Sequence, residues 1–229
     1  MLQEFITFFS GHFYIPLYFL AFIVATIKYR QYFDTPLKYY PILIAYTFFN
    51  ELLGYLVRNN PNISFFSDIQ YSAYNDIIYN IFSVIFFAFF FKVYWQLIKS
   101  KTYQKWIIYS AIITGLTFFA SCFFQNPFDT NLYYATAVGS WSLIFCVGLY
   151  FYDRSNNGKK LVQTRNLMSW ISSGLLVFYF LFPILYLIGY LDYYTWEKYS
   201  LRTVLKILII VMYGLIIIGF VKGKRRAFE

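Results

Sequence analysis

Seven apolar stretches, each long enough to cross a bilayer, fill most of this 229-residue chain. A membrane-spanning helix needs about 20 mainly apolar residues, because each residue adds about 1.5 Å and the hydrocarbon core is about 30 Å thick. The pattern predicts an all-α polytopic membrane protein, a bundle of seven transmembrane helices. The predicted spans lie near residues 12–28, 37–57, 74–97, 105–124, 132–151, 168–190 and 199–221.

Composition supports a membrane class. Hydrophobic residues make up 60% of the chain and charged residues 13%, with a mean hydropathy of +0.53, whereas soluble proteins carry about 25% charged residues. The longest gaps between spans hold about fifteen residues, which is too few for an aqueous domain of about 50 residues or more. We therefore expect residues 1–229 to form a single transmembrane domain.

The basic residues fall into alternate gaps, which predicts the orientation. Fifteen of the nineteen Lys and Arg residues lie in or beside the first, third and fifth gaps and after the last span. Cytoplasmic loops are enriched in Lys and Arg, so the amino terminus is predicted outside and the carboxyl terminus in the cytoplasm. Because these cations are spread over separate short loops, lipid headgroups explain the net charge of +9 and we expect no nucleic-acid partner.

The most informative polar residue is Glu51, within the second span. An ionisable group in hydrocarbon costs several kcal/mol unless it is paired or hydrated. Lys206, in the seventh span, is predicted at about the same depth, roughly 10 Å below the outer boundary at 1.5 Å per residue. Asn80 in the third span and Ser140 in the fifth share this layer, so Glu51 and Lys206 are expected to neutralise each other across the bundle.

Further polar and aromatic residues extend this layer toward the outer surface. Arg58, Arg202 and Asp76 are predicted to crowd the outer mouth, and Asn50 precedes Glu51 in the chain. Helical spacing aligns Asp76 and Asn80 on one face of the third span. Trp141 is the one tryptophan predicted inside a span rather than at an interface, and it reads as a packing residue or a ligand contact. The picture is a polar ligand pocket or vestibule open to the outside.

Two structural alternatives compete with a ligand site. The Glu51 and Lys206 pair could clip two helices together without binding anything, or Glu51 could be protonated and neutral in its buried setting. A retinal Schiff base at Lys206 is disfavoured, because Arg202 rather than a carboxylate stands one turn before it.

Catalysis is not expected. The sole histidine, His12, cannot assemble a zinc site, and no Ser or Cys has a histidine base. No Gly-rich phosphate loop appears either. We predict no enzyme activity, no metal and no cofactor.

Three segments carry a resemblance to a known family: residues 50–55 (Asn-Glu-Leu-Leu-Gly-Tyr), 78–82 (Ile-Tyr-Asn-Ile-Phe) and 167–171 (Leu-Met-Ser-Trp-Ile). They resemble recurrent segments of an uncharacterised bacterial family of seven-helix integral membrane proteins, whose members are often encoded beside sensor histidine kinases. The resemblance implies a sensory, receptor-like module of the bacterial inner membrane that signals to a membrane or cytoplasmic partner such as a histidine kinase. The alternative is a small-solute or ion transporter that uses Glu51 and Lys206.

Overall fold

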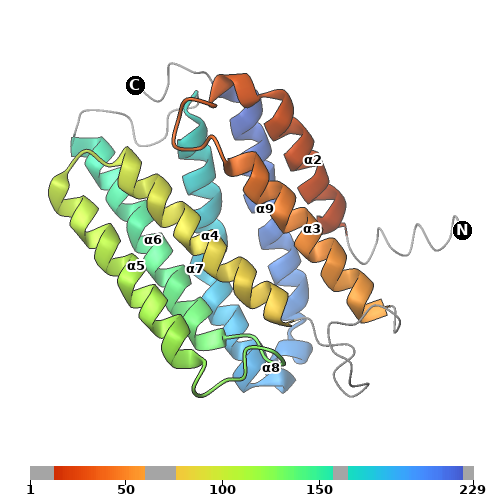
Figure 1. Cartoon of the computed structure of the whole chain (residues 1–229). Helices are drawn as coiled ribbons and strands as arrows, with labels where there is room; N and C mark the ends of the chain where they lie inside the picture. Colours follow the sequence, from red (N-terminus) through yellow and green to blue (C-terminus); the bar gives the residue numbers. More distant parts are fainter. Residues whose placement is uncertain (1–12, 60–75, 157–164, 224–229) are drawn as a thin grey trace, which may run out of the picture.

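The computed structural model describes residues 13–59, 76–156 and 165–223, and every regular element in these ranges is a helix (Figure 1). His12 lies outside the described residues, as does the side chain of Arg58. The elements are α2 (Tyr14–Ile27), the short 3-10 helix η1 (Tyr29–Gln31), α3 (Tyr40–Asn59), α4 (Asp76–Leu97), α5 (Lys101–Ser121), α6 (Tyr133–Asn156), α7 (Leu167–Leu191), α8 (Tyr193–Lys198) and α9 (Leu201–Lys222).

Each predicted apolar stretch coincides with one of the longer helices, and α8 is an additional short helix between α7 and α9. Among the described residues, five helices are long and apolar enough to cross a membrane: α3, α4, α6, α7 and α9. The described part of α2 has only 14 residues, and the first turns of α5 are polar because they contain Lys101, Gln104 and Lys105. The structure therefore supports a multi-pass integral membrane protein, and the seven-span topology stays a prediction.

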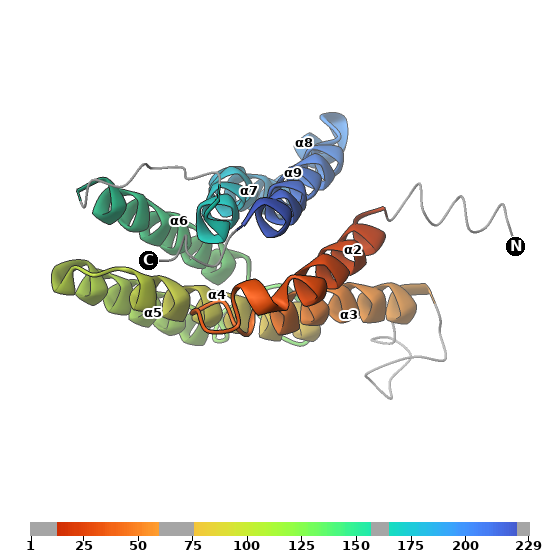
Figure 2. The same cartoon turned by 90° about the horizontal axis from the view of Figure 1, so that it is seen from above.

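The long helices pack as a closed ring in the order α2, α3, α4, α5, α6, α7, α9 and back to α2, with α4 also contacting α6. Seen along the bundle, α6, α7 and α9 form one row and α5, α4 and α3 form the other, while α2 lies between α9 and α3 (Figure 2). Helix α2 thus separates α3 from α9 on one side of the ring.

Side-chain caps set the boundaries of the last helices. The Asn166 side chain accepts a hydrogen bond from the Ser169 backbone N–H at the start of α7, at 3.3 Å. Asp192 ends α7 and caps α8, because its carboxylate accepts from the Thr195 backbone N–H and hydroxyl at 3.1 and 2.6 Å. These bonds lower the pKa of the exposed Asp192 carboxyl below its ordinary value of 3.8. Such caps satisfy backbone donors that a helix start leaves unpaired.

The two ends of the bundle differ in charge. The connections η1 to α3 and α4 to α5 lie at one end, called here the basic end, together with the end of α6, the start of α7 and the end of α9. Its described cations include Lys28, Arg30, Lys38, Lys99, Lys101, Lys105, Arg154, Arg165 and Lys222. The opposite end, the α8 end, carries α8 and the connection from α5 to α6. The positive-inside rule predicts that the basic end faces the cytoplasm, and this orientation stays a prediction.

Candidate ligand-binding cavity

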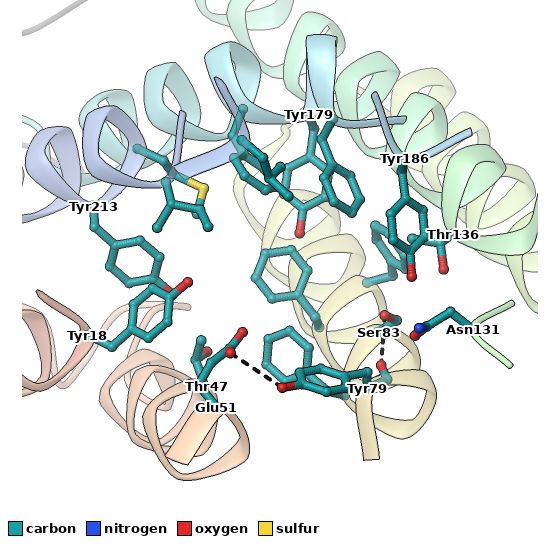
Figure 3. A pocket seen from close by; sticks show the side chains of 18 of the residues that line it. Tyr18, Thr47, Glu51, Tyr79, Ser83, Asn131, Thr136, Tyr179, Tyr186 and Tyr213 are labelled. Atoms are coloured by element: carbon teal, nitrogen blue, oxygen red, sulfur yellow. Dashed lines mark hydrogen bonds between the residues drawn. The ribbon is translucent and has the colours of Figure 1, made fainter. Parts of the chain in front are cut away.

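A cavity of about 500 Å³ lies between α2, α3, α4, α6, α7 and α9 (Figure 3). This volume is within the range of about 300–1,000 Å³ typical of small-molecule sites. Its wall is mainly aromatic and carries one acid and one base. The lining residues are Tyr18, Thr47, Glu51, Tyr79, Phe82, Ser83, Phe86, Phe87, Asn131, Thr136, Phe178, Tyr179, Phe182, Tyr186, Arg202, Leu205, Ile209, Met212 and Tyr213.

The aromatic wall is a set of rings in mutual contact. The centroids of Tyr18 and Tyr213 are 4.5 Å apart, which joins α2 to α9. On α7, Phe182 stacks on Tyr186 with centroids 5.0 Å apart, and Tyr179 lies 5.5 Å from Phe86 of α4. Such ring pairs are stabilising by about 0.5–1.5 kcal/mol beyond their buried area, so the wall is a pre-formed surface rather than a loose gap.

Glu51 presents its carboxylate to this cavity from α3. The Tyr79 hydroxyl donates a hydrogen bond to the Glu51 Oε2 at 3.4 Å, a long and weak contact. Figure 3 shows the two side chains pointing toward each other along one wall, with Thr47, one turn before Glu51, on the same face. Within residues 13–59, 76–156 and 165–223, no ion pair engages Glu51.

The expected pair of Glu51 with Lys206 is therefore not formed, and this expectation was wrong. Lys206 does not line the cavity, and its Nζ lies 5.9 Å from the centroid of the Phe13 ring, next to α2. Lys206 lies beside Phe13 at the edge of α9 that borders α2, outside the cavity-lining set that includes Arg202 and Leu205, so similar depth does not bring the two side chains together.

Arg202 is the one cation among the described cavity-lining residues. It occupies the first turn of α9 and is exposed, so it lies at the α8 end of the cavity. Asp76 does not line the cavity, and its Oδ1 accepts a hydrogen bond from the Asn131 side-chain amide. Of the residues predicted at the outer mouth, Arg202 therefore lines the cavity, and Asp76 accepts a hydrogen bond from Asn131, which lines it.

Asn80 points away from the cavity and holds a connection between helices. Its side-chain N–H₂ donates to the backbone carbonyls of Pro127 and Thr130 at 2.8 and 3.0 Å. Its Oδ1 accepts from the Leu132 backbone N–H at 2.9 Å. All three hydrogen bonds fix the connection from α5 to α6 onto α4, which gives Asn80 a structural task.

Three other predicted site residues also lie off the cavity wall. Ser140 is fully buried and its hydroxyl donates to the Thr136 carbonyl in its own helix at 2.7 Å. Asn50 is buried on α3. Trp141 is 48% exposed, so it lies on the outer surface of the bundle, where lipid contacts an indole readily.

Sequence reasoning missed Tyr18, Tyr79, Tyr179 and Tyr186, which all line the cavity. The spacing of polar residues along each helix offered a usable signal. Thr47 and Glu51 are four residues apart, as are Tyr79 and Ser83, and residues four apart share a helix face. Tyr186 lies seven residues after Tyr179 and returns to the same face of α7. In a chain with twenty-five tyrosines, however, spacing alone does not show which faces turn inward.

Toward the basic end, the space between the helices is filled. Tyr40 stacks on Phe220 at 5.9 Å and meets Phe90 edge-on at 5.8 Å. The hydroxyls of Tyr94 and Ser172 share a hydrogen bond of 2.9 Å between α4 and α7. The cavity therefore ends inside the bundle rather than crossing it.

The described residues contain no group of three or more His, Cys, Asp and Glu side chains that could hold a metal ion. No protein-family model matches the chain, and neither the curated proteins nor the solved structures contain a significant match. The cavity and its chemistry therefore carry the functional argument.

Proposed function

We propose that this chain is a receptor-like integral membrane protein that binds a small molecule in the cavity and passes the signal to a partner. The partner would be a membrane or cytoplasmic signalling protein such as a histidine kinase, in a bacterial inner membrane. The observation that carries the proposal is a cavity of about 500 Å³ that faces the α8 end, closed toward the basic end by packed aromatic rings. This geometry is that of a binding pocket rather than a pore.

A contiguous set of contacts links the cavity to the basic end. The ring centroid of Phe86, on the cavity wall, lies 4.8 Å from that of Phe90, and the centroids of Phe90 and Tyr94 are 6.4 Å apart. Tyr94 lies 5.8 Å from Tyr150, whose hydroxyl accepts a hydrogen bond from Arg154 Nη1 at 3.2 Å. A ligand that shifted the cavity wall would disturb this chain of rings, because packed cores do not deform continuously.

The last part of this series of contacts, at Arg154, is also hydrogen-bonded to a loop of the basic end through the neighbouring Asp153. The Lys99 backbone N–H donates to Asp153 Oδ2 at 3.3 Å, so the connection from α4 to α5 is attached to α6 beside Arg154. Asp153 and Arg154 are both buried. A partner beneath the membrane would therefore meet a surface that is coupled mechanically to α4 and α6.

The test is photo-crosslinking of the full chain in its native membrane from a probe at Lys38, an exposed residue of the basic end. Recovery of a kinase or another signalling protein is expected, and Tyr94→Phe should weaken the partner's response several-fold while ligand affinity stays within about twofold. The phenylalanine keeps the ring and removes only the bond to Ser172. Recovery of no signalling protein would count against the proposal.

A transporter is the second candidate, and one observation favours it: Pro183 lies inside α7, the helix that supplies a large part of the cavity wall. Proline removes a backbone donor and gives a helix a place to bend. Solute uptake into proteoliposomes that collapses in Glu51→Gln would establish transport. A partner-dependent response without flux would establish the receptor.

A further inference from the structure

We propose that the ligand of this cavity is a small organic ammonium compound, with its positive nitrogen beside Glu51 and its apolar body against the tyrosine and phenylalanine wall. The inference rests on the proposed function and names the ligand class of the same site. It combines three observations: an acid with no counter-ion among the described residues, an aromatic enclosure and a base at the rim.

The acid is short of partners. Glu51 receives one hydrogen bond of 3.4 Å, from Tyr79, and in the described part of the chain no Lys or Arg lies within ion-pairing distance of it. A carboxylate that deep in a membrane protein needs a counter-charge or several donors. Its carboxylate faces the cavity, so a ligand that brings an N–H donor or a positive charge would satisfy it.

The enclosure suits a cation as well. Tyr18, Tyr79 and Tyr213 surround Glu51 on one side of the cavity, with Tyr179 and Tyr186 opposite (Figure 3). Ring faces attract a cation within about 6 Å of the centroid, and the attraction grows when water is excluded. Aromatic faces around a single acid form a site that prefers a cation over a neutral molecule of the same shape.

The base lies elsewhere on the wall. Arg202 is exposed in the first turn of α9, whereas Glu51 stands eight residues before the end of α3 at Asn59, roughly 12 Å below that end at 1.5 Å per residue. A ligand with a second, anionic group would meet Arg202 only if it spanned this depth. A compact amine therefore matches the interior of the cavity better than an anion does.

The experiment measures binding of phenethylamine, a cation at neutral pH, and of phenethyl alcohol, its neutral counterpart, to the full chain in nanodiscs. Empty nanodiscs provide the reference for partitioning into lipid. We expect wild-type protein to bind the amine about tenfold or more tightly than the alcohol, since hydrogen bonds to charged groups are the stronger class. In Glu51→Gln this preference should fall to about twofold or less.

Ser140→Ala is the matched control, because Ser140 is a buried polar residue off the cavity wall that bonds only within its own helix. It should keep the wild-type preference. If Glu51→Gln fails to fold, the amine-to-alcohol ratio of the wild type still decides. Equal binding of both compounds overturns the ammonium class and leaves the proposed receptor standing. Tighter binding of phenylalanine than of phenethylamine overturns it in favour of a zwitterion held by Arg202.

Discussion

Replacing Asn80 by leucine should destabilise the protein without touching the cavity. The change removes three hydrogen bonds of 2.8, 3.0 and 2.9 Å to Pro127, Thr130 and Leu132, and leaves three backbone groups of the α5–α6 connection to find other partners. With a net value of about 1 kcal/mol per hydrogen bond, the expected loss is about 3 kcal/mol in the free energy of unfolding.

The assay is equilibrium unfolding in mixed micelles with an increasing fraction of a denaturing detergent. Ser83→Ala on the same helix is the control, because the Ser83 hydroxyl donates only to the Tyr79 carbonyl one turn earlier, at 2.9 Å. Its loss should stay below about 0.5 kcal/mol. Asn80→Asp should cost about as much as Asn80→Leu, since a carboxylate cannot donate to the two carbonyls.

A loss below about 0.5 kcal/mol in Asn80→Leu would refute the structural assignment of this residue. A fall in phenethylamine affinity that is larger in Asn80→Leu than in Ser83→Ala would also refute the structural assignment, because Asn80 lies off the cavity wall. Asn80 would then belong to the ligand site, as its place in the polar layer first indicated.

Two further predictions concern helix packing and pH. Gly174→Ala should destabilise the bundle by roughly 1–3 kcal/mol, because an added Cβ would lie 3.0 Å from the backbone oxygen of Met212 on α9. Gly148→Ala is the control for the same unfolding assay. Its added Cβ would meet nothing within 4 Å, so the free energy of unfolding should stay the same or rise. The Asp192 caps of α8 hold its pKa below 3.8, mainly through the Thr195 hydroxyl, so their contribution is complete above that pH and is lost as the pH falls through the lowered pKa. A carboxyl ¹³C titration should show Thr195→Val moving the pKa up toward 3.8, and an unchanged pKa would contradict the cap.

Most of the helical framework could be predicted from the sequence, because apolar runs of about 20 residues leave the backbone few alternatives in lipid. The predicted stretches at 74–97 and 199–221 became α4 (Asp76–Leu97) and α9 (Leu201–Lys222) within a few residues. The additional α8 depends on the Asp192 cap, a local signal within a gap between spans.

The candidate site was harder to predict than the helices, since hydropathy indicates how deep a residue lies in the membrane but not which neighbouring helix its side chain faces. Glu51 lies in a helix long enough to span a membrane and on the cavity wall, whereas Lys206, at a similar predicted depth, lies beside Phe13 and off that wall. Gly139 illustrates the same limit. Its small size gives no direction around the ring, and the structure shows that the residue approaching it is Phe87 of α4, with a ring carbon 2.6 Å from where a Cβ would stand.

The central claim is that Glu51 faces a cavity that a cation can enter from the α8 end. It is tested most directly by the modification rate of Ser83→Cys, a cavity-lining position, with a trimethylammonium methanethiosulfonate reagent on intact cells. The background carries Cys122→Ser, since Cys122 is exposed, while Cys146 is buried. Ser172→Cys, in the fully buried packing near the basic end, is the negative control.

We expect the reagent to modify Ser83→Cys from the outside, at a rate that falls several-fold when Glu51→Gln is added and when phenethylamine is present, and to leave Ser172→Cys unmodified. An unreactive Ser83→Cys, or a rate that does not depend on Glu51, would contradict it.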